Sequence, residues 1–483
     1  MPPELPRGLD PRLVQAGLLV LAGLALASLY HRSCYIDDAW LGERAYWLAR
    51  EGVVRSELFR GPLDYGERMF VFHKLLALTG ATFIRLFGWS LYVLKSVSLV
   101  SFFAFLGLLW RYCRRFESKD VFVLTTLVLL GHGLLGSRIF VYRPEVMLMA
   151  LGFGCFFLLR SFLEGTEWPR ATLAGGAVLA GLGALAHLNG LMFIAAGTLL
   201  LLLRRRPGPA AVFAVLASSV TALYFADAAL AGAVPTLWRQ LLTDPMLVQR
   251  IPDAGSHFTG LLSEHQRYFH SRGEILFSLL LLGAGVVAAR FTRLRANPLV
   301  PFTVALAVSL ALLSPERHAH YAIPLFPYLA LIVADGLAHG LPRAGRVAGA
   351  VLVVLLWIHV AHGAAQLGQI IATNEDTATR NRALAAHIRP GATVVATLPF
   401  VFDEIESRTV HGLEPYWIRS GYGRAPIPPD ALFADAHRRG ARYAILSHED
   451  LKFSGWPGAT LPRSGANYRQ IHRDDDHLIL ELF

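Results

Sequence analysis

The chain has 483 residues, of which 54% are hydrophobic and only 17% are charged, and its mean hydropathy is +0.45. This composition excludes a single water-soluble core, because the sequence divides into many apolar runs near the length that crosses a bilayer. The net charge of +10 does not indicate a nucleic-acid-binding protein, because no soluble basic module is present and basic residues of membrane proteins collect in cytoplasmic loops. The three cysteines, Cys34, Cys113 and Cys155, are scattered and form no CxxC pair, so they indicate neither a disulfide framework nor a zinc site.

Continuously apolar runs such as LVQAGLLVLAGLALASLY predict membrane-spanning α-helices, because the strands of a β-barrel would alternate apolar and polar residues. We therefore predict a polytopic α-helical membrane protein with about 11 spans. The predicted spans cover about residues 13–30, 91–110, 121–136, 146–162, 171–187, 189–203, 209–230, 275–290, 298–314, 321–338 and 347–364.

Clusters of basic residues predict the orientation of these spans. All four clusters fall on one side if each run crosses once, and the positive-inside rule assigns that side to the cytoplasm. The other loops and the tail from about residue 371 are then extracytoplasmic, and the Ala-, Arg- and Gly-rich composition favours the cytoplasmic (inner) membrane of a bacterium. The basic clusters are Arg111, Arg114, Arg115 and Lys119; Arg204, Arg205 and Arg206; Arg290, Arg293 and Arg295; and Arg343 with Arg346.

The apolar run MFVFHKLLALTGATFIRLFG, residues 69–88, does not fit this topology. As a full span it would invert every later loop and break the positive-inside rule. We therefore predict a juxtamembrane or re-entrant helix on the outer face, which is allowed where protein covers the polar groups of the helix.

Beyond residue 371 the long apolar runs give way to short elements. TATRNRALAAHI and DALFADAHRRG predict helices, whereas ATVVATLPF, ARYAILS and HLILELF predict strands. We therefore predict two domains, a transmembrane catalytic domain at residues 1–370 and a small extracytoplasmic α/β domain at residues 371–483.

Two adjacent carboxylates, Asp37 and Asp38, follow the first span and precede the aromatic-rich helix AWLGERAYWLAREG. One interpretation is a helix cap or a solvated acidic loop. The other is a catalytic site, because partial burial at the membrane surface can raise a carboxylate pKa into the range of a general base. The aromatic residues favour a helix that lies flat at the interface and holds both acids over the opening of the bundle.

The stretch SRIFVYRPE places Arg138, Arg143 and Glu145 at the outer end of a span. Snorkelling arginines beside an ordinary helix start would explain them. However, the positive-inside rule disfavours arginines on this face, and an anionic phosphate is a natural partner for two of them. We therefore take these three residues as candidates for binding the donor phosphate or substrate.

A third stretch, SPERHAHYAIPLFP, begins another span from the same side. An interfacial polar turn would explain its composition, and a lone H-x-H pair is weak support for a metal site. We prefer a role in phosphate or substrate binding. The short AHLNG turn carries His187 and Asn189, which we interpret as turn residues before the helix stop Gly190. The binding candidates in the third stretch are Arg317, His318, His320 and Tyr321.

In this order and on this common face, the stretches resemble the GT-C glycosyltransferases, on the branch of the protein O-mannosyltransferases, the aminoarabinose transferase of lipid A and related bacterial sugar transferases. IDDAWLGERAYWLAREG resembles the first-loop motif of that family, and FHKLLALTGATFIRLFGWSLYVLKSVSLV resembles the segment that follows it. YRPEVMLMA resembles the second-loop motif, and RHAHYAIPLFPYLALIVADG resembles a late span with two prolines. The resemblance covers most of residues 10–365.

The resemblance implies a GT-C fold, a sugar donor carried on polyprenyl phosphate, and an acceptor reached from outside the cytoplasmic membrane. It also implies an inverting displacement at the anomeric carbon, with Asp37 as the base beside the acidic Asp38. Because the family often has Glu at the second position, these two aspartates could exchange roles. Pro-Pro often follows the His or Lys of the family, whereas Leu75 and Leu76 follow here. The residues implied for the lipid phosphate are His73, Lys74 and Arg317.

We therefore predict a membrane glycosyltransferase that acts on a glycan, lipid or protein acceptor. Its leaving group is already an anionic phosphate ester, so it needs cations to hold developing charge, whereas the acceptor hydroxyl needs a base. The sequence does not decide whether a divalent metal joins carboxylate and phosphate. The alternatives are a transporter or flippase of a lipid-linked envelope precursor, which would place ionisable residues inside its spans, and a non-catalytic envelope-assembly protein.

Overall fold

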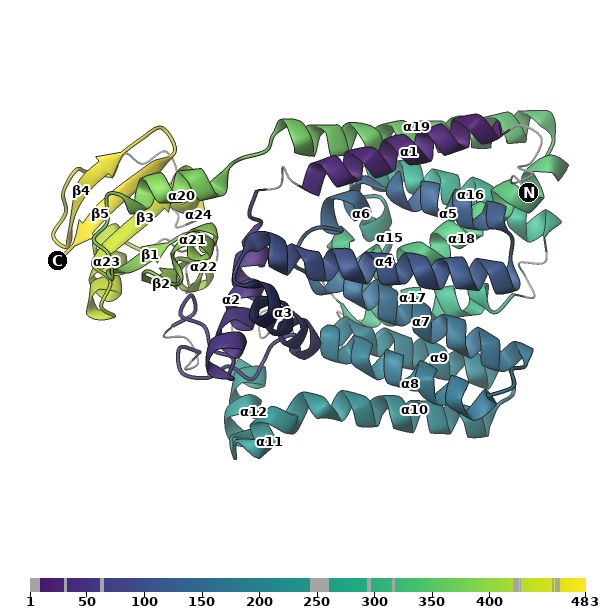
Figure 1. The fold of residues 1–483 in the computed structure, drawn as a ribbon, viewed down its shortest axis with the longest axis horizontal. Helices are drawn as coiled ribbons and strands as arrows, with labels where there is room; N and C mark the ends of the chain where they lie inside the picture. Colours follow the sequence, from purple (N-terminus) through teal and green to yellow (C-terminus); the bar gives the residue numbers. More distant parts are fainter. Residues whose placement is uncertain are drawn as a thin grey trace.

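A helical bundle with a five-stranded sheet at one end forms the molecule (Figure 1). The computed structural model describes residues 9–29, 33–60, 65–243, 260–292, 297–314, 318–419, 425, 427–453, 456 and 461–483. The bundle is built from helices that run back and forth between the end that carries the sheet and the opposite end.

The helices of the bundle are α1 (Pro11–Leu29), α4 (Leu91–Phe116), α5 (Lys119–Leu130), α6 (Gly133–Arg138), α7 (Pro144–Glu164), α8 (Pro169–Ala186), η1 (Leu188–Gly190), α9 (Leu191–Leu203), α10 (Pro207–Ala222), α16 (Arg272–Phe291), α17 (Leu299–Leu313), η4 (Ala319–Leu325), α18 (Phe326–Asp335), η5 (Gly336–Gly340), η6 (Leu341–Arg343) and α19 (Arg346–Ala372). Shorter helices at the end near the sheet are α2 (Ile36–Glu51), α3 (Lys74–Phe87), η2 (Leu223–Phe225), α11 (Ala226–Leu230), α12 (Val234–Thr243) and α15 (His265–Tyr268).

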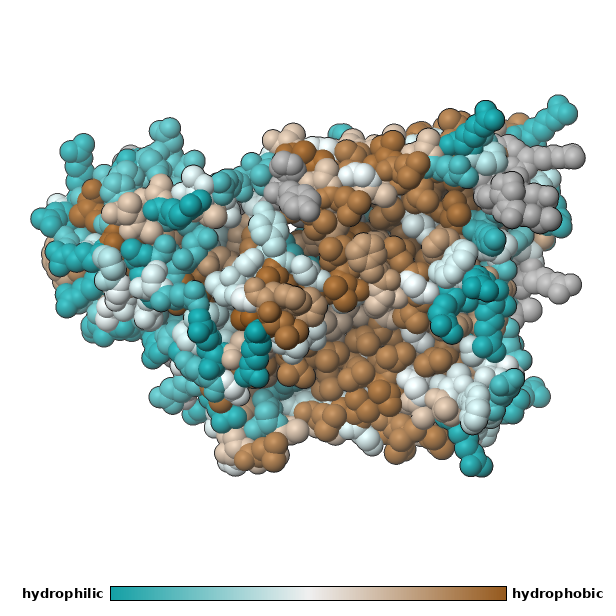
Figure 2. Space-filling model, in the orientation of Figure 1, coloured by the Kyte–Doolittle hydropathy of each residue, from teal (hydrophilic) through white to brown (hydrophobic). Residues whose placement is uncertain are grey.

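The bundle is a multi-pass integral membrane domain. In the described part of the chain, eight helices are long and apolar enough to cross a bilayer, and two shorter apolar helices accompany them. Figure 2 shows a belt of hydrophobic side chains around the bundle, bounded by hydrophilic side chains at both ends. Helices lie at every predicted span, so the predicted polytopic α-helical class is confirmed.

One predicted span is interrupted in a way that the sequence pattern does not show. The run at 121–136 divides into α5 and α6, because the chain turns at Gly131 where α19 crosses it. A Cβ atom built on Gly363 of α19 would lie 2.2 Å from the carbonyl oxygen of Gly131, so this approach of the backbones requires glycine at position 363.

The connections from α4 to α5, from α9 to α10 and from η6 to α19 all lie at the end opposite the sheet (Figure 1). Three of the four predicted basic clusters therefore share one end of the bundle. This arrangement is what the positive-inside argument requires. Which end faces the cytoplasm stays a prediction.

The predicted helix at residues 69–88 begins at Lys74 as α3 and packs against α2 at the end near the sheet, instead of crossing the bundle. Gly80 permits this packing, because a Cβ atom there would lie 2.9 Å from the Cβ of Ala45. The hydroxyl of Tyr142, just before α7, donates a hydrogen bond of 2.7 Å to the carbonyl oxygen of Leu76. The two short helices therefore form a platform fixed to the bundle.

The sheet follows α19 and has the strand order β2-β1-β3-β5-β4. β1 pairs in parallel with β2 and β3, whereas β5 pairs antiparallel with β3 and β4. The strands are β1 (Thr393–Ala396), β2 (Thr409–Gly412), β3 (Tyr443–Ser447), β4 (Tyr468–Arg473) and β5 (His477–Leu482). The helices and turns around them are α20 (Thr377–Ala385), η7 (Leu398–Phe400), α21 (Val401–Glu404), α22 (Glu414–Arg419), α23 (Pro429–Arg438) and α24 (His448–Phe453).

The sequence predicted α20, α23, β1, β3 and β5, but it missed the two edge strands. β2 is four residues long and contains a histidine, and β4 is rich in exposed polar residues. Polar composition is usual at sheet edges, where it limits aggregation, and it hides the strand from a hydrophobicity pattern.

The sheet docks on the platform through both its core and its backbone. The ring of Trp89 stacks on Phe402 at 4.8 Å, and its Nε1 donates a hydrogen bond of 2.8 Å to the Phe402 carbonyl oxygen. The Gly412 amide donates to the Leu58 carbonyl oxygen at 2.9 Å. One hydrophobic cluster contains residues of α2, α3, β1 and β3. Division into two domains at residue 371 therefore stays a prediction.

The glycine contact between α5 and α19 predicts a sharp difference between two positions on one helix. Gly363→Ala should lower stability by about 2 kcal/mol, because the added methyl group overlaps the backbone of Gly131. Gly368→Ala, on the same helix with no atom within 4 Å of the new Cβ, should leave stability equal or higher. Thermal unfolding of the purified variants in detergent measures both, and equal melting temperatures would contradict the packing described.

Candidate active site

The N-terminus of α2 is fixed by the buried carboxylate of Asp38. Its two oxygens accept hydrogen bonds from the backbone amides of Tyr35, at 2.9 Å, and Tyr142, at 2.6 Å. Lys95 of α4 lies 3.5 Å from the same carboxylate and donates to the Ser33 carbonyl oxygen at 2.9 Å. Burial raises the pKa of Asp38, and the nearby ammonium group and the two amides oppose that rise. Asp38 thus ties α2 to the segment that enters α7.

Asp37, one position earlier, faces a different partner. Its carboxylate forms an ion pair with the guanidinium of Arg143, the N-cap residue of α7. The side chain of Asp37 is 19% exposed, whereas that of Asp38 is fully buried. The guanidinium also binds Glu145, with Nη2 2.7 Å from Oε1. Arg143 therefore forms ion pairs with two carboxylates at once.

The third predicted stretch reaches the same place. The Nε2 atom of His320, at the start of η4, lies 3.9 Å from Oε1 of the buried Glu145. Asp37, Arg143 and His320 come from three segments separated by more than 100 positions in the chain. The structure brings these residues together at the end of the bundle that carries the sheet.

A row of ring side chains continues from His320. Tyr321 lies 4.4 Å from His320 and 5.5 Å from His187, and His187 stacks on His73 at 4.8 Å. Burial and the neighbouring His187 hold the pKa of His73 well below its usual range, so this imidazole is neutral at neutral pH. The neighbouring His318 stacks on His320 at 5.2 Å. Neutral imidazoles can both donate and accept hydrogen bonds.

Sequence reasoning missed one member of this row. We predicted that His187 is a turn residue, and its Nδ1 does accept a hydrogen bond of 3.0 Å from the Asn189 amide. Its ring also joins His73 to Tyr321, which a short turn motif could not reveal.

Arg44, on α2, is a second residue that sequence reasoning missed, and it lies close enough to lower the pKa of His73 further. The spacing of Arg44 from Asp37, seven positions along a helix, was the available signal.

Two other candidates, Lys74 and Arg138, have further partners of their own. The ammonium of Lys74 binds Asp227 of α11 at 2.7 Å and the Phe70 carbonyl oxygen at 2.7 Å, and burial lowers the pKa of Lys74 to about 8. Arg138 contacts Tyr35, with Nη2 3.3 Å from the hydroxyl and the guanidinium 4.4 Å from the ring centroid. Arg317 lies outside the described residues.

A metal site is not formed by this arrangement in the described part of the chain. No three His, Cys, Asp or Glu side chains of the described residues group as ligands for a metal ion. Asp37 and Glu145 both contact Arg143 instead. The arrangement offers a partly exposed carboxylate, a largely buried cation beside it, and a row of rings that includes the neutral imidazole of His73.

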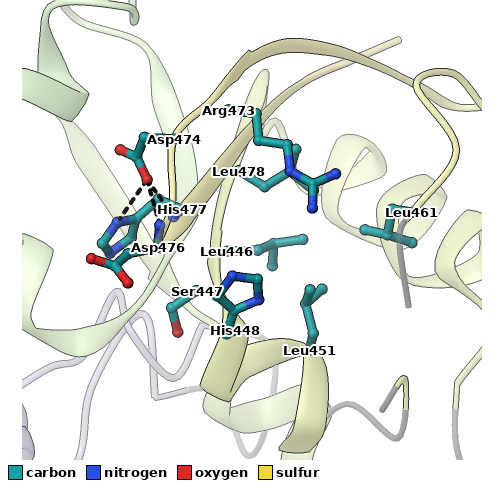
Figure 3. A pocket seen from close by; sticks show the side chains of 10 residues that line it. All are labelled: Leu446, Ser447, His448, Leu451, Leu461, Arg473, Asp474, Asp476, His477 and Leu478. Carbon is teal, nitrogen blue, oxygen red and sulfur yellow. Dashed lines mark hydrogen bonds and ion pairs between the residues drawn. The ribbon is translucent and has the colours of Figure 1, made fainter. Parts of the chain in front are cut away.

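A small hollow lies away from this site, beside the sheet (Figure 3). It opens where β3 ends and β5 begins, and leucine side chains form its apolar wall. Asp474 accepts hydrogen bonds from the Asp476 and His477 amides and so shapes the turn beside it. No predicted site residue lines this hollow.

No protein-family model and no curated protein sequence matches the chain. Several solved structures do align with the fold of the chain. ArnT from Cupriavidus metallidurans bound to undecaprenyl phosphate aligns over 98% of both chains, with a TM-score of 0.65 and 13% identity. The archaeal oligosaccharyltransferase AglB from Archaeoglobus fulgidus, in complex with an inhibitory peptide and a dolichol-phosphate, aligns over 92% of this chain and 71% of its own, with a TM-score of 0.55 and 14% identity. The arabinofuranosyltransferase AftD from Mycobacteria aligns over 99% of this chain and 40% of its own, with a TM-score of 0.51 and 14% identity. The chain therefore has the GT-C glycosyltransferase fold, as predicted.

The ion pair of Asp38 with Lys95 predicts strong energetic coupling between these two buried charges. Asp38→Asn and Lys95→Met should each lower stability by about 3 kcal/mol, because each leaves the other group buried without its partner. The double variant should lose less than the sum of the two, which a double-mutant cycle of thermal unfolding would measure. Strictly additive losses would mean that the two groups do not interact.

Proposed function

We propose that the chain is a membrane glycosyltransferase that moves a sugar from a polyprenyl-phosphate donor to an acceptor hydroxyl on a glycan, lipid or protein. The observation that carries this proposal is the contact of Asp37 with Arg143 at the polar end of an apolar bundle. A lipid-linked donor keeps its chain in the bilayer while its phosphate reaches water, so its chemistry belongs at this boundary. The fold shared with ArnT bound to undecaprenyl phosphate supports the same donor class.

In this proposal Asp37 is the general base. The acceptor oxygen attacks the anomeric carbon as its proton passes to Asp37, and the bond from that carbon to the phosphate oxygen breaks. The polyprenyl phosphate leaves with the electron pair of the broken bond, and the configuration inverts. Asp37 suits this role because it is the exposed member of the acidic pair.

Arg143 links base and leaving group. In the free protein it is paired with both Asp37 and Glu145, and a donor phosphate would compete with Asp37 for the same guanidinium. Binding of the donor then releases the Asp37 carboxylate for proton transfer and places a cation on the oxygen that becomes charged. The other predicted ligands of the donor phosphate or substrate stay proposals of the same kind: Arg138, Glu145, His73, Lys74, Arg317, His318, His320 and Tyr321.

Asp38 takes a positioning role in this proposal, because its oxygens are occupied by two backbone amides and Lys95 lies beside them. We place the site and the sheet on the extracytoplasmic side of a bacterial inner membrane, since three of the four basic clusters lie at the opposite end.

Replacing Asp37 tests the base. Asp37→Asn should reduce transfer by about 10³-fold, since an amide cannot take the acceptor proton, while the melting temperature stays near that of the wild type. Mass spectrometry of envelope glycoconjugates from cells lacking the protein, complemented with each variant, gives the readout. Asp475→Asn, an exposed aspartate in the sheet, is the matched control. Full transfer by Asp37→Asn would overturn the proposal, and a transported but uncleaved phospho-sugar would favour a flippase.

Replacing Arg143 tests the phosphate contact. Arg143→Gln should weaken binding of undecaprenyl phosphate by about 10-fold or more, and Arg143→Lys should lie between, because lysine keeps the charge without the planar fork. Native mass spectrometry of the purified protein with added undecaprenyl phosphate measures this. Arg114→Gln, at the opposite end of the bundle, should bind as the wild type does. Unchanged binding by Arg143→Gln would contradict the assignment.

A further inference from the structure

A short helical hairpin, η2 to α12 (Leu223–Thr243), leaves the end of α10 beside the site and presents an apolar face outward. Leu230 is 91% exposed, Leu242 63% and Trp238 49%. The Trp238 ring lies 5.8 Å from that of the partly exposed Phe225, so an apolar contact joins η2 to α12 on this side. Figure 2 shows hydrophobic side chains gathered at the place of α11 and α12 in Figure 1.

The opposite face of this hairpin is buried and grips the segment that precedes α3. Gln240 is fully buried; its Oε1 accepts a hydrogen bond of 2.8 Å from the Phe70 amide, and its Nε2 donates one of 2.9 Å to the Arg68 carbonyl oxygen. The Phe70 ring lies in a small core with Leu237 and Tyr224. The hairpin therefore binds both the backbone and a side chain of this segment.

A second contact fastens the same segment at its other end. Lys74 binds Asp227 of α11 and the Phe70 carbonyl oxygen, and it lies 5.0 Å from the ring centroid of Tyr224. His73 stands between these two attachment points and stacks on His187, which leads to the rings beside Glu145. The position of His73 thus depends on the position of the hairpin.

The surrounding surface indicates what covers the exposed face. Residues 207–230 form one 24-residue apolar helical stretch of membrane-spanning length, so the apolar face of the hairpin continues the hydrophobic belt without a break. Trp238 stands where such a helix would meet the headgroup region, and tryptophan favours that boundary. A helix with one apolar and one polar or buried face lies in the plane of the interface.

We propose that the hairpin is an interfacial anchor: its apolar face inserts into the lipid leaflet on the side of the site, and its buried face holds His73 in place. The anchoring itself rests on the belt and the exposed side chains, whereas its consequence for catalysis rests on the proposed function. His73 is then positioned by contact with the membrane.

Depth measurements test the anchor directly. A spin label on Leu242→Cys in lipid nanodiscs should be more accessible to oxygen than to a water-soluble nickel chelate, and a label on Asp475→Cys in the sheet should show the reverse. The native cysteines Cys34, Cys113 and Cys155 are buried and remain in place. Preferential collision with the nickel chelate at Leu242 would overturn the proposal, and so would protection from both reagents, which would indicate a protein partner or a second copy.

Hydrogen exchange tests the link to His73. Leu242→Asp in nanodiscs should speed amide exchange in residues 68–74 by at least tenfold, since a charge on the apolar face withdraws the hairpin from lipid, whereas Leu242→Ala should change it little. Gln240→Leu should speed exchange of the Phe70 amide, because it removes the acceptor of that amide together with the donor to the Arg68 carbonyl oxygen. Unchanged amide exchange in Leu242→Asp would contradict the anchor proposal and would not affect the result for Asp37→Asn. An active Asp37→Asn protein would sink the proposed function while leaving the exchange result intact.

Discussion

The guanidinium of Arg143, shared between Asp37 and Glu145, constrains the candidate site more than any other contact. Glu145 is buried at the first turn of α7, and a buried carboxylate without a cation would cost several kcal/mol. Arg143 supplies that cation from the N-cap position and reaches across to α2 at the same time. The ends of two helices far apart in sequence are therefore held at one point by one charge.

This point lies where a lipid-linked substrate could be handled. Inside the hydrocarbon region an unpaired charge is costly, so the ionic groups gather at the end of the bundle and pair with one another. The sheet packs on α2 and α3 through a shared hydrophobic cluster. The stability of the platform that carries Asp37 therefore depends on the sheet as well as on the bundle, although the sheet contributes no predicted site residue.

The same end of the molecule also carries a row of ring side chains next to the ion-paired residues. The row of rings from His320 to His73 meets the carboxylate–guanidinium group at Glu145 and extends toward the hairpin of α11 and α12. Burial favours the neutral form of His73, so this ring adds hydrogen-bonding capacity without adding charge. Arg44 lies near the same ring, so a cation is present at this end of the row as well.

The sequence alone determined the class of the protein, the position of each span and three of the five strands, because continuous apolar runs and short alternations are local properties of the chain. Charge placement and the resemblance to the GT-C family also predicted that three distant stretches share one face. Only the tertiary structure decided how neighbouring residues divide their roles. Asp37 and Asp38 are equivalent in a sequence pattern, yet a helix turns successive side chains by about 100 degrees, so one meets Arg143 and the other meets the Tyr142 amide and Lys95. The roles of Lys74 and His187 were also decided by the tertiary structure. Lys74 pairs with Asp227 and His187 stacks on His73, and each of these partners lies more than 100 positions away in the chain, where no local pattern contains it.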